Sequence, residues 1–256
     1  MYYKVTGKGK AVVLVHGFIE EGSMWNDTAK VLSKHYKVIV PDLEGFGSSP
    51  LLSKKLSMEH YADALYAMLQ EEKIKKCVLL GHSMGGYIAL HFAEKYPHML
   101  SGFGLVNSHC FADTDEKKAN RKKGCDFIAR HGSAPFVREL YYNIFHDIFK
   151  KTPAGKKLIE ALIKKAEKYT PEALIAANTA MMNRKSKEDV LRNAQVPVLL
   201  INGKQDESAP LALTSQQASF APVADVHFYD TCKHMSIFEK KKEALKAIQR
   251  FVDFCN

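Results

Sequence analysis

Short apolar runs that alternate with helix-like patterns restrict the fold of this chain more than any other sequence feature. Three of the runs, at residues 11–15, 77–80 and 197–201, carry no polar side chain, which is typical of strands buried on both faces of a sheet. Helical stripes of apolar residues lie between runs, for example at residues 58–69 and 88–93. This alternation predicts an α/β fold with helices flanking a mostly parallel sheet. The six predicted strands are residues 11–15, 36–40, 77–80, 103–106, 197–201 and 226–229.

The alternation stops in the middle of the chain. Between residues 110 and 190 no segment has the pattern of a buried strand, whereas four segments have helical patterns. One of these begins at Thr170-Pro171, where a capping hydroxyl precedes a proline at the first helical position. We therefore expect a core domain made of residues 1–109 and 191–256, interrupted by an all-helical insertion at residues 110–190.

The chain is basic, and the excess charge is uneven. Its 256 residues include 37 Lys and Arg against 28 Asp and Glu, a formal net charge of +9. The segment from Phe111 to Val190 has 17 basic and 11 acidic residues, which is +6 of this excess. Such runs usually form solvated helix faces, and no nucleic-acid motif accompanies them. Nucleic acid is therefore not expected as a partner, and a protein that binds anionic surfaces through this charge is the least favoured interpretation.

Cysteine usage and hydropathy bear on where the chain works. The five cysteines are widely spaced and include no C-x-x-C pair, which argues against a disulfide framework and against a zinc site. No run of about 18 apolar residues is present, so no membrane span is expected. The first residues also lack the apolar stretch of a secretory signal. These features predict a reducing, cytoplasmic location.

The motif Gly81-His82-Ser83-Met84-Gly85 lies where a predicted buried strand meets a predicted helix. A nucleophile elbow needs this context, because a sharp turn lifts the serine hydroxyl clear of the sheet. The flanking glycines allow the tight bend, since larger side chains would clash there. The amides at the start of the following helix also face developing negative charge. Ser83 is therefore predicted to be a catalytic nucleophile.

A serine hydroxyl needs a base, and the base needs an orienting acid. Among the 11 histidines, His234 stands out because it follows the last predicted strand and precedes the last helix. Asp206 follows the strand at residues 197–201, so the chain order is serine, acid, histidine. Glu207, the neighbouring carboxylate, is the alternative acid.

Other places for the acid are less favoured. Asp225 and Asp230 lie too near or inside the last predicted strand. The end of the strand at residues 103–106 is a known alternative position, but Asn107-Ser108-His109 supply no carboxylate there. The catalytic residues predicted from strand ends are thus Ser83, Asp206 and His234.

The oxyanion that forms in acyl transfer needs hydrogen-bond donors. One is expected to be the backbone amide of Met84, the residue after the nucleophile. The other is expected to be the amide of Phe18, in the His16-Gly17-Phe18 turn after the first buried strand. His16 itself is expected to shape this loop rather than to transfer protons.

These motifs together resemble the α/β-hydrolase superfamily, and in particular its small, esterase-like serine hydrolases, over nearly all of the chain. The resemblance rests on His16–Phe18, Pro41–Ser49, Gly81–Gly86, Gly203–Asp206 and His234. It implies a central sheet of about eight strands with the triad at its carboxyl edge. It also implies that the insertion is a helical cap, or lid, and that Asp42 stabilises its loop rather than taking part in catalysis.

The activity that the resemblance implies is that of a carboxylesterase-like serine hydrolase. Epoxide hydrolases and dehalogenases of similar sequence carry aspartate at the nucleophile position, so Ser83 favours acyl transfer to water. Thioesterases, lactonases, carbon–carbon bond hydrolases and perhydrolases share the triad, and spacing does not separate them. A ligand-binding, receptor-like protein with vestigial turnover is the alternative of another class. No dinucleotide loop and no metal motif are present, so no cofactor or metal is expected.

Substrate selection is expected to come from the insertion, because the triad and the oxyanion amides contact only the carbonyl. The expected substrate is a small-molecule ester with apolar groups, since ligand pockets are mostly apolar. Basic residues of the insertion, such as Lys122 and Lys123, are expected to face water. The large apolar residues from which the pocket could draw are Phe111, Phe127, Phe136, Tyr141, Tyr142, Phe145, Phe149, Met181 and Met182.

Overall fold

Seven strands form one sheet in the part of the chain that the structure, a computed structural model, describes: residues 1–53 and 55–256. Their order is β1-β3-β2-β4-β5-β6-β7; β1 is antiparallel to β3, and all other neighbours are parallel. The strands are β1 (Tyr3–Thr6), β2 (Ala11–Val15), β3 (Lys37–Pro41), β4 (Cys77–His82), β5 (Leu100–Val106), β6 (Val198–Gly203) and β7 (Ala224–Tyr229).

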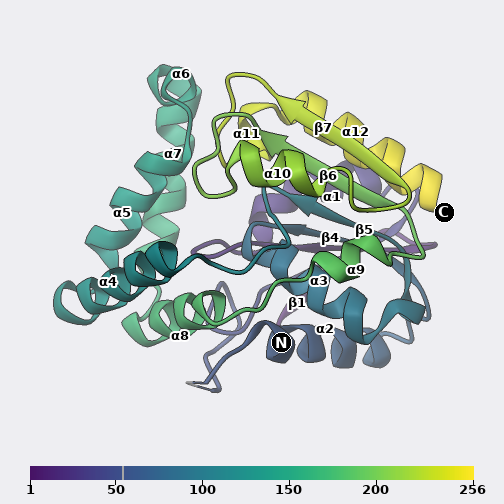
Figure 1. Cartoon of the computed structure of the whole chain (residues 1–256), viewed down its shortest axis with the longest axis horizontal. Coiled ribbons are helices and arrows are strands. Elements are labelled where there is room, and N and C mark those ends of the chain that lie inside the picture. The colour runs from purple at the N-terminus through teal and green to yellow at the C-terminus, as the bar shows by residue number, and fades with distance from the viewer. Residues whose placement is uncertain (54) are drawn as a thin grey trace.

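Helices flank this sheet, with α12 above it and α2 below it in the view of Figure 1. The helices of the core are α1 (Asn26–Leu32), α2 (Met58–Glu71), α3 (Met84–Lys95), α9 (Glu188–Arg192), α10 (Leu211–Gln217), α11 (Ser236–Glu239) and α12 (Lys241–Cys255). Those of the middle segment are α4 (Asp115–His131), α5 (Ser133–Ile144), α6 (Asp147–Lys151), α7 (Pro153–Ala166) and α8 (Pro171–Met182).

The predicted α/β architecture is confirmed, and all six predicted strands are present with ends shifted by a few residues at most. The sheet of the described chain nevertheless has seven strands rather than about eight. The strand that the sequence analysis does not predict is β1, which has only four residues, three of them exposed, and contains no continuous apolar run.

The sheet is buried on both faces, which explains the continuous apolar runs. Every residue of β2 is buried, and its successive side chains point to opposite faces. Val12 and Leu14 pack with Trp25 and with Phe251 of α12 on one face. Val13 packs on the other face, in the cluster that includes α2 and α3. An alternating pattern would have left one of these faces in water.

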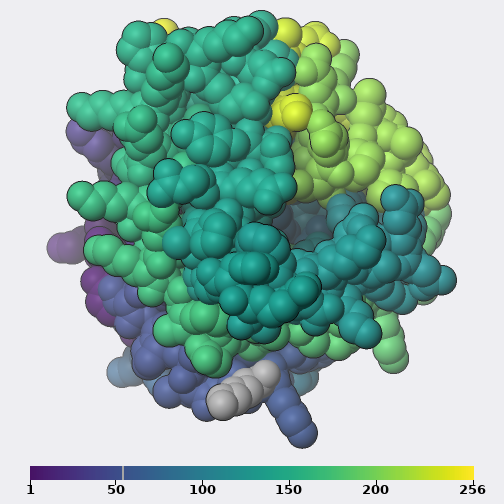
Figure 2. Space-filling view, turned by 90° about the vertical axis from the view of Figure 1, so that its left-hand side faces the viewer, coloured from purple at the N-terminus to yellow at the C-terminus, as the bar shows by residue number. Residues whose placement is uncertain are grey.

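Helices α4 to α8 lie together to one side of the sheet, at the left of Figure 1. They span residues 115–182, within the range of 110–190 predicted for the insertion. Figure 2 shows this side of the molecule, where the teal helices meet the green and yellow C-terminal part of the chain. That the segment acts as a separate cap domain stays a prediction.

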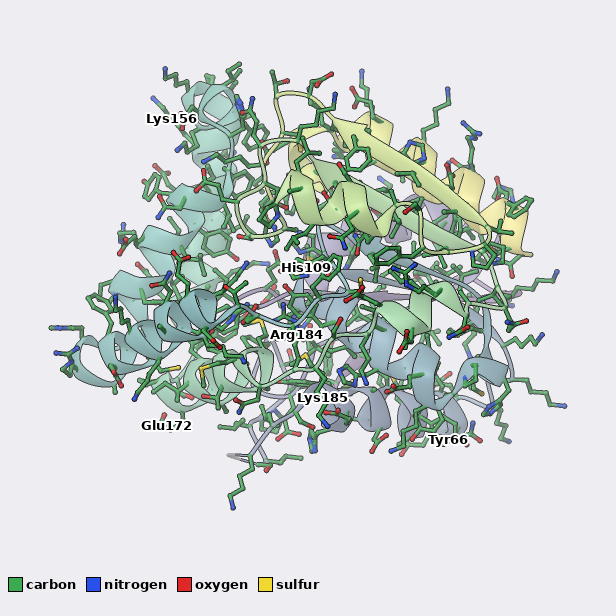
Figure 3. The ribbon with its side chains drawn as sticks, in the orientation of Figure 1. Tyr66, His109, Lys156, Glu172, Arg184 and Lys185 are labelled. Carbon is green, nitrogen blue, oxygen red and sulfur yellow. The ribbon has the colours of Figure 1, made fainter. Side chains whose placement is uncertain are left out.

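A buried carboxylate ties the two ends of this helical segment together. The Asp113 side chain, which is fully buried, lies 2.5 Å from Nε of Arg121 on α4 and 2.8 Å from a guanidinium nitrogen of Arg184, just after α8. Figure 3 shows Arg184 near the middle of the molecule, whereas Lys156 and Glu172 lie at the outside. Burial by itself would raise the pKa of Asp113, but the two guanidinium groups lower it.

We expect Asp113→Asn to lower the free energy of unfolding by about 3 kcal/mol at pH 7, because it leaves the buried Arg184 and the partly buried Arg121 without their counter-ion. Urea denaturation measures this loss, and Asp115→Asn, an exposed change on α4, is the control. The folded-state pKa of Asp113 is depressed, so its stabilisation is present above the unfolded value of about 3.9 and is lost as the pH falls through the folded value. A difference between wild type and variant that grows on acidification would contradict this assignment.

Candidate active site

Ser83 lies on a strained turn between β4 and α3. Its φ of 50° and ψ of −114° put it in a region that residues with a side chain rarely adopt. A Cβ on Gly81 would come within 2.1 Å of the Gly85 carbonyl oxygen, and one on Gly85 within 2.6 Å of the Val15 carbonyl oxygen. The two glycines of the motif therefore have no room for a side chain, and the turn closes tightly beneath Ser83.

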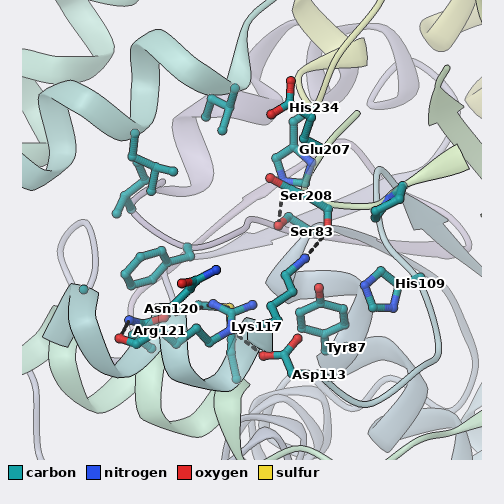
Figure 4. A pocket seen from close by; sticks show the side chains of 18 of the residues that line it. Ser83, Tyr87, His109, Asp113, Lys117, Asn120, Arg121, Glu207, Ser208 and His234 are labelled. Atoms are coloured by element: carbon teal, nitrogen blue, oxygen red, sulfur yellow. Dashed lines mark hydrogen bonds and ion pairs between the residues drawn. The ribbon is translucent and has the colours of Figure 1, made fainter. Parts of the chain in front are cut away.

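Three side chains from three strand ends meet above this turn. Ser83 Oγ lies 2.8 Å from Nε2 of His234, and Nδ1 of the same ring lies 2.8 Å from Oδ2 of Asp206. Figure 4 shows His234 directly over Ser83. The structure thus brings together the serine, base and acid that the sequence predicts, in the arrangement by which an imidazole accepts a serine proton.

Asp206, rather than its neighbour Glu207, has the environment of an orienting acid. Its side chain is fully buried, and Oδ1 accepts hydrogen bonds from the amides of Ser208 and Ala209 at 2.8 and 2.9 Å. Burial would raise the pKa of Asp206, but attraction to His234 and these hydrogen bonds lower it, so the carboxylate stays ionised. The Glu207 side chain is 83% exposed and pairs with Lys233.

Asn107 is a site residue that the sequence reasoning missed. Its Nδ2 donates to Asp206 Oδ2 at 3.1 Å and to the Lys233 carbonyl at 3.0 Å, while its Oδ1 accepts from the Ser236 amide at 3.2 Å. It therefore joins the end of β5 to the loops that carry the acid and the base. Its sequence signal is its position directly after β5, which is the alternative position for the catalytic acid. An amide cannot be that acid, but it can hold the acid by a hydrogen bond.

The loop predicted to supply an oxyanion donor lies against the elbow. A Cβ on Gly17 would come within 3.0 Å of the Ser83 Cβ, and Phe18 lines the same cavity as Ser83. Met84 is the first residue of α3, so its amide is one of those that lack a partner inside the helix. The backbones of Phe18 and Met84 are therefore both next to the nucleophile.

His16 and Asp42 are buried and bind backbone groups in and around this loop, as expected for residues that stabilise it. His16 Nε2 accepts a hydrogen bond from the Leu43 amide at 2.8 Å, and its Nδ1 lies 2.8 Å from the Gly17 carbonyl oxygen. Burial lowers the pKa of His16, which favours the neutral ring. Asp42 accepts hydrogen bonds from the amides of Gly22 and Ser48, both at 2.8 Å.

A cavity of about 610 Å³ opens above Ser83. Its apolar lining comes mainly from Phe18, Phe136, Leu140, Ile144, Met181 and Leu213. Of the nine apolar candidates from the insertion, Phe136 and Met181 are among these lining residues. The helical segment therefore covers the strand ends and supplies part of the pocket wall.

The cavity also has a polar lining, which corrects one expectation. Lys117 and Arg121 of α4 line the cavity, so the expectation that the basic residues of the insertion face water is wrong for these two. Lys117 Nζ donates to the Ser208 carbonyl at 2.6 Å, across the pocket from its own helix (Figure 4). His109 lies in the same wall, and burial together with nearby cations lowers its pKa to about 3, so it is neutral. Lys122 is exposed, as expected.

Two further kinds of feature are relevant to the described part of the chain, metal-binding clusters and membrane-spanning helices. Within residues 1–53 and 55–256, no cluster of three or more His, Cys, Asp and Glu side chains could hold a metal ion. None of the helices in that part of the chain is long and apolar enough to cross a membrane. The chemistry considered below uses protein groups, substrate and water.

Residues 10–126 match the family model described as alpha/beta hydrolase fold. Over its full length the chain is similar to the pimeloyl-[acyl-carrier protein] methyl ester esterase of Vibrio cholerae, with 26% identity over 257 residues that cover 99% of this chain and 97% of the relative. This similarity spans the core and the helical segment alike.

Solved structures show the same arrangement. A thermophilic esterase from Thermogutta terrifontis, solved with malate bound, superposes with a TM-score of 0.93 at 29% identity, covering 99% of this chain and 93% of the esterase. An enol-lactonase from Burkholderia xenovorans LB400 superposes with a TM-score of 0.91 at 19% identity, covering 98% and 96% of the two chains, and shows a shared fold.

The two neighbouring carboxylates should respond differently to neutralisation. We expect Asp206→Asn to lower kcat by about 10⁴-fold, because an amide cannot stabilise the imidazolium of His234 or fix its tautomer. Glu207→Gln should leave kcat within about twofold, since its exposed pair with Lys233 contributes little. Steady-state kinetics on an activated ester measure both. A larger loss in Glu207→Gln than in Asp206→Asn would show that the acid is assigned to the wrong residue.

Proposed function

We propose that the chain is a carboxylesterase-like hydrolase of the α/β-hydrolase superfamily and that it cleaves carboxylic esters through an acyl intermediate on Ser83. The hydrogen-bonded chain from Ser83 through His234 to Asp206, set at the floor of a cavity, carries the proposal. Relatives and solved structures named as esterases, at 26% and 29% identity over almost the whole chain, support it.

The geometry supports a two-step reaction. In the first step Ser83 Oγ attacks the ester carbonyl while His234 takes its proton, and the amides of Phe18 and Met84 stabilise the oxyanion. The tetrahedral intermediate collapses as His234 returns the proton to the departing alcohol. In the second step His234 activates a water that attacks the acyl-serine, which releases the acid and restores Ser83. Asp206 stabilises the imidazolium in both steps.

Other acyl substrates use the same groups. A thioester or lactone would place its carbonyl at Ser83 in the same way, and the enol-lactonase shares the fold. Carbon–carbon bond hydrolysis and perhydrolysis would need further groups that position a carbanion or a peroxide. A receptor-like protein would have the same fold but would hydrolyse esters far more slowly than an enzyme. Turnover of an activated ester at an enzymatic rate separates the esterase from the receptor.

We propose that the acyl chain lies along the apolar wall and that its far end meets the polar wall. Phe136 and Leu140 offer a dry surface for a hydrocarbon chain, while Lys117 and Arg121 offer donors in the same cavity. Arg121 is already held by the Asp113 carboxylate, whereas Lys117 Nζ donates to a neutral backbone carbonyl. The pocket thus fits an apolar chain that ends in a carboxylate or another acceptor.

The proposed location is a reducing compartment such as the cytoplasm. All five cysteines are free, and Cys77, Cys110 and Cys232 are buried. Burial raises the pKa of the Cys110 thiol to about 12, which keeps it protonated and unreactive.

Small-molecule esters, rather than nucleic acid, are the partners that the cavity supports.

Ser83→Ala should abolish ester hydrolysis while leaving the fold intact. Without the hydroxyl no acyl-enzyme forms, and the remaining oxyanion donors support a residual rate far below that of the wild type. Turnover of a p-nitrophenyl ester and labelling by a fluorophosphonate probe, mapped by mass spectrometry, measure the loss. Ser108→Ala, which removes a nearby hydroxyl that bonds to the Ser83 carbonyl, is the control for a structural effect. Wild-type turnover in Ser83→Ala would refute the mechanism.

Lys117→Met should change which esters are preferred. We expect kcat/KM for a methyl ester whose acyl chain ends in a carboxylate to fall about tenfold, because the variant loses a charge-assisted hydrogen bond. The equal-length ester ending in a methyl group should change by less than about twofold, since the apolar wall is intact. Lys122→Met, an exposed change on the same helix, is the matched control. Equal losses for both esters would remove Lys117 from substrate selection.

A further inference from the structure

Glu20 and His82 form a second acid–histidine pair directly beneath the candidate active site. The side chains of Glu20 and His82 are 3% and 0% exposed, and Glu20 Oε2 lies 2.9 Å from His82 Nδ1. His82 precedes Ser83 at the end of β4. Glu20 follows the His16-Gly17-Phe18 turn, the oxyanion loop. The mechanism proposed above assigns no part to either residue.

The hydrogen bonds of His82 determine its charge. One ring nitrogen faces the Glu20 carboxylate, and the other, Nε2, lies 2.9 Å from the His234 backbone carbonyl oxygen. Both partners are acceptors, and a neutral imidazole has a single N–H to donate. Satisfying both contacts therefore requires a proton on each ring nitrogen, which makes His82 an imidazolium next to an ionised Glu20.

The surroundings stabilise this charge state. Burial by itself would lower the pKa of His82, but Glu20 and the His234 carbonyl raise it above its usual value. Burial would likewise raise the pKa of Glu20, but His82 and the Gly17 amide lower it. Other titratable groups near the pair include His16, Asp206, Tyr141, Tyr169 and the His234 ring, which lies 5.1 Å from the His82 ring.

The pair joins the three segments that carry the reacting groups. Glu20 Oε2 also accepts a hydrogen bond from the Gly17 amide at 2.6 Å, which fixes the oxyanion loop and occupies that amide. His82 is bonded to Ser83 through the chain and to the backbone of His234 through its ring. A displacement of any one segment would therefore stretch a hydrogen bond to a buried charge, which is costly.

We infer that Glu20 and His82 are positioning residues, a buried ion pair that sets the oxyanion loop and the backbone of the general base at their working distances from Ser83. The inference rests on the proposed function of Ser83. The pair acts through Gly17 and His234 rather than on the substrate, so its loss should impair the chemical step more than binding. Misplacement of reacting groups by about 1 Å can cost about 10²-fold in rate.

Glu20→Gln is the decisive variant, because it keeps the size of the side chain and removes its charge. Gly17 N and His82 Nδ1 both contact Oε2 of Glu20. If the glutamine places its amide nitrogen at this position, that N–H group faces the Gly17 N–H donor. If it places its amide oxygen there, the charged His82 ring has no counter-ion. We expect kcat to fall between about 10- and 100-fold with KM within about threefold. The rate of Ser83 phosphonylation should fall in parallel. Glu21→Gln, which changes the neighbouring, partly exposed glutamate, should stay within about twofold.

Nuclear magnetic resonance of protein with ¹⁵N-labelled histidine tests the charge state without relying on a variant that must fold. The His82 ring, identified in the wild type by its proximity to the His234 ring, should show two N–H protons at pH 7. A single ring proton, or an unchanged kcat in Glu20→Gln, would overturn the inference while leaving the role of Ser83 intact. Full activity of Ser83→Ala would instead overturn the proposed function on which it rests.

Discussion

The turn at Ser83 is the constraint on which the site depends. Its left-handed backbone is held by close packing, because a Cβ on Gly81 would meet the first turn of α3 and a Cβ on Gly85 would meet the end of β2. The strain is compensated by the buried strands on either side and by the hydrogen bond from the Ser83 amide to the Val106 carbonyl. Fixing this turn fixes the serine hydroxyl at the carboxyl edge of the sheet, where the loops after β6 and β7 deliver the acid and the base.

Buried charge organises the surroundings of this turn at two places. Asp206 receives donors from the backbone, from Asn107 and from His234, and so remains an acceptor for the imidazole. The Glu20–His82 pair ties the oxyanion loop to the loop of the base. In each case a carboxylate is shielded from water but surrounded by donors, which is the condition under which burial is tolerated. Preorganised groups of this kind need little rearrangement during the reaction.

The helical segment supplies part of the pocket wall above this site. Asp113 joins the start of the segment at α4 to the residues that follow α8, and so holds its two ends against the core. The same salt-bridge cluster includes Arg121, which lines the pocket. The cavity therefore has both apolar and charged lining residues, and Arg121 belongs both to the attachment of the segment and to the pocket wall.

Local sequence patterns were enough for the fold and for the predicted triad, because strand ends in a parallel sheet are few and chemically distinctive. Mainly apolar runs predict six of the seven strands of the described chain, whereas β1 is a four-residue, mostly exposed edge strand. Ser83, Asp206 and His234 are predicted from their positions after such runs. Asn107 and Glu20 are not predicted, because what a loop amide or carboxylate binds depends on partners that are distant in the sequence.

The sequence by itself determined the order of strands and helices, the elbow and the chain order of serine, acid and histidine, because these follow from short-range apolar patterning and from glycine sterics. The tertiary structure decided what distant segments do to one another. Glu20 meets His82 across 62 positions, Arg121 meets Asn178 across 57, and Lys117 reaches Ser208 across 91. Charge and hydrogen bonding depend on distance in space, which sequence separation does not reveal, and they determine which polar groups are buried with partners and which face the cavity.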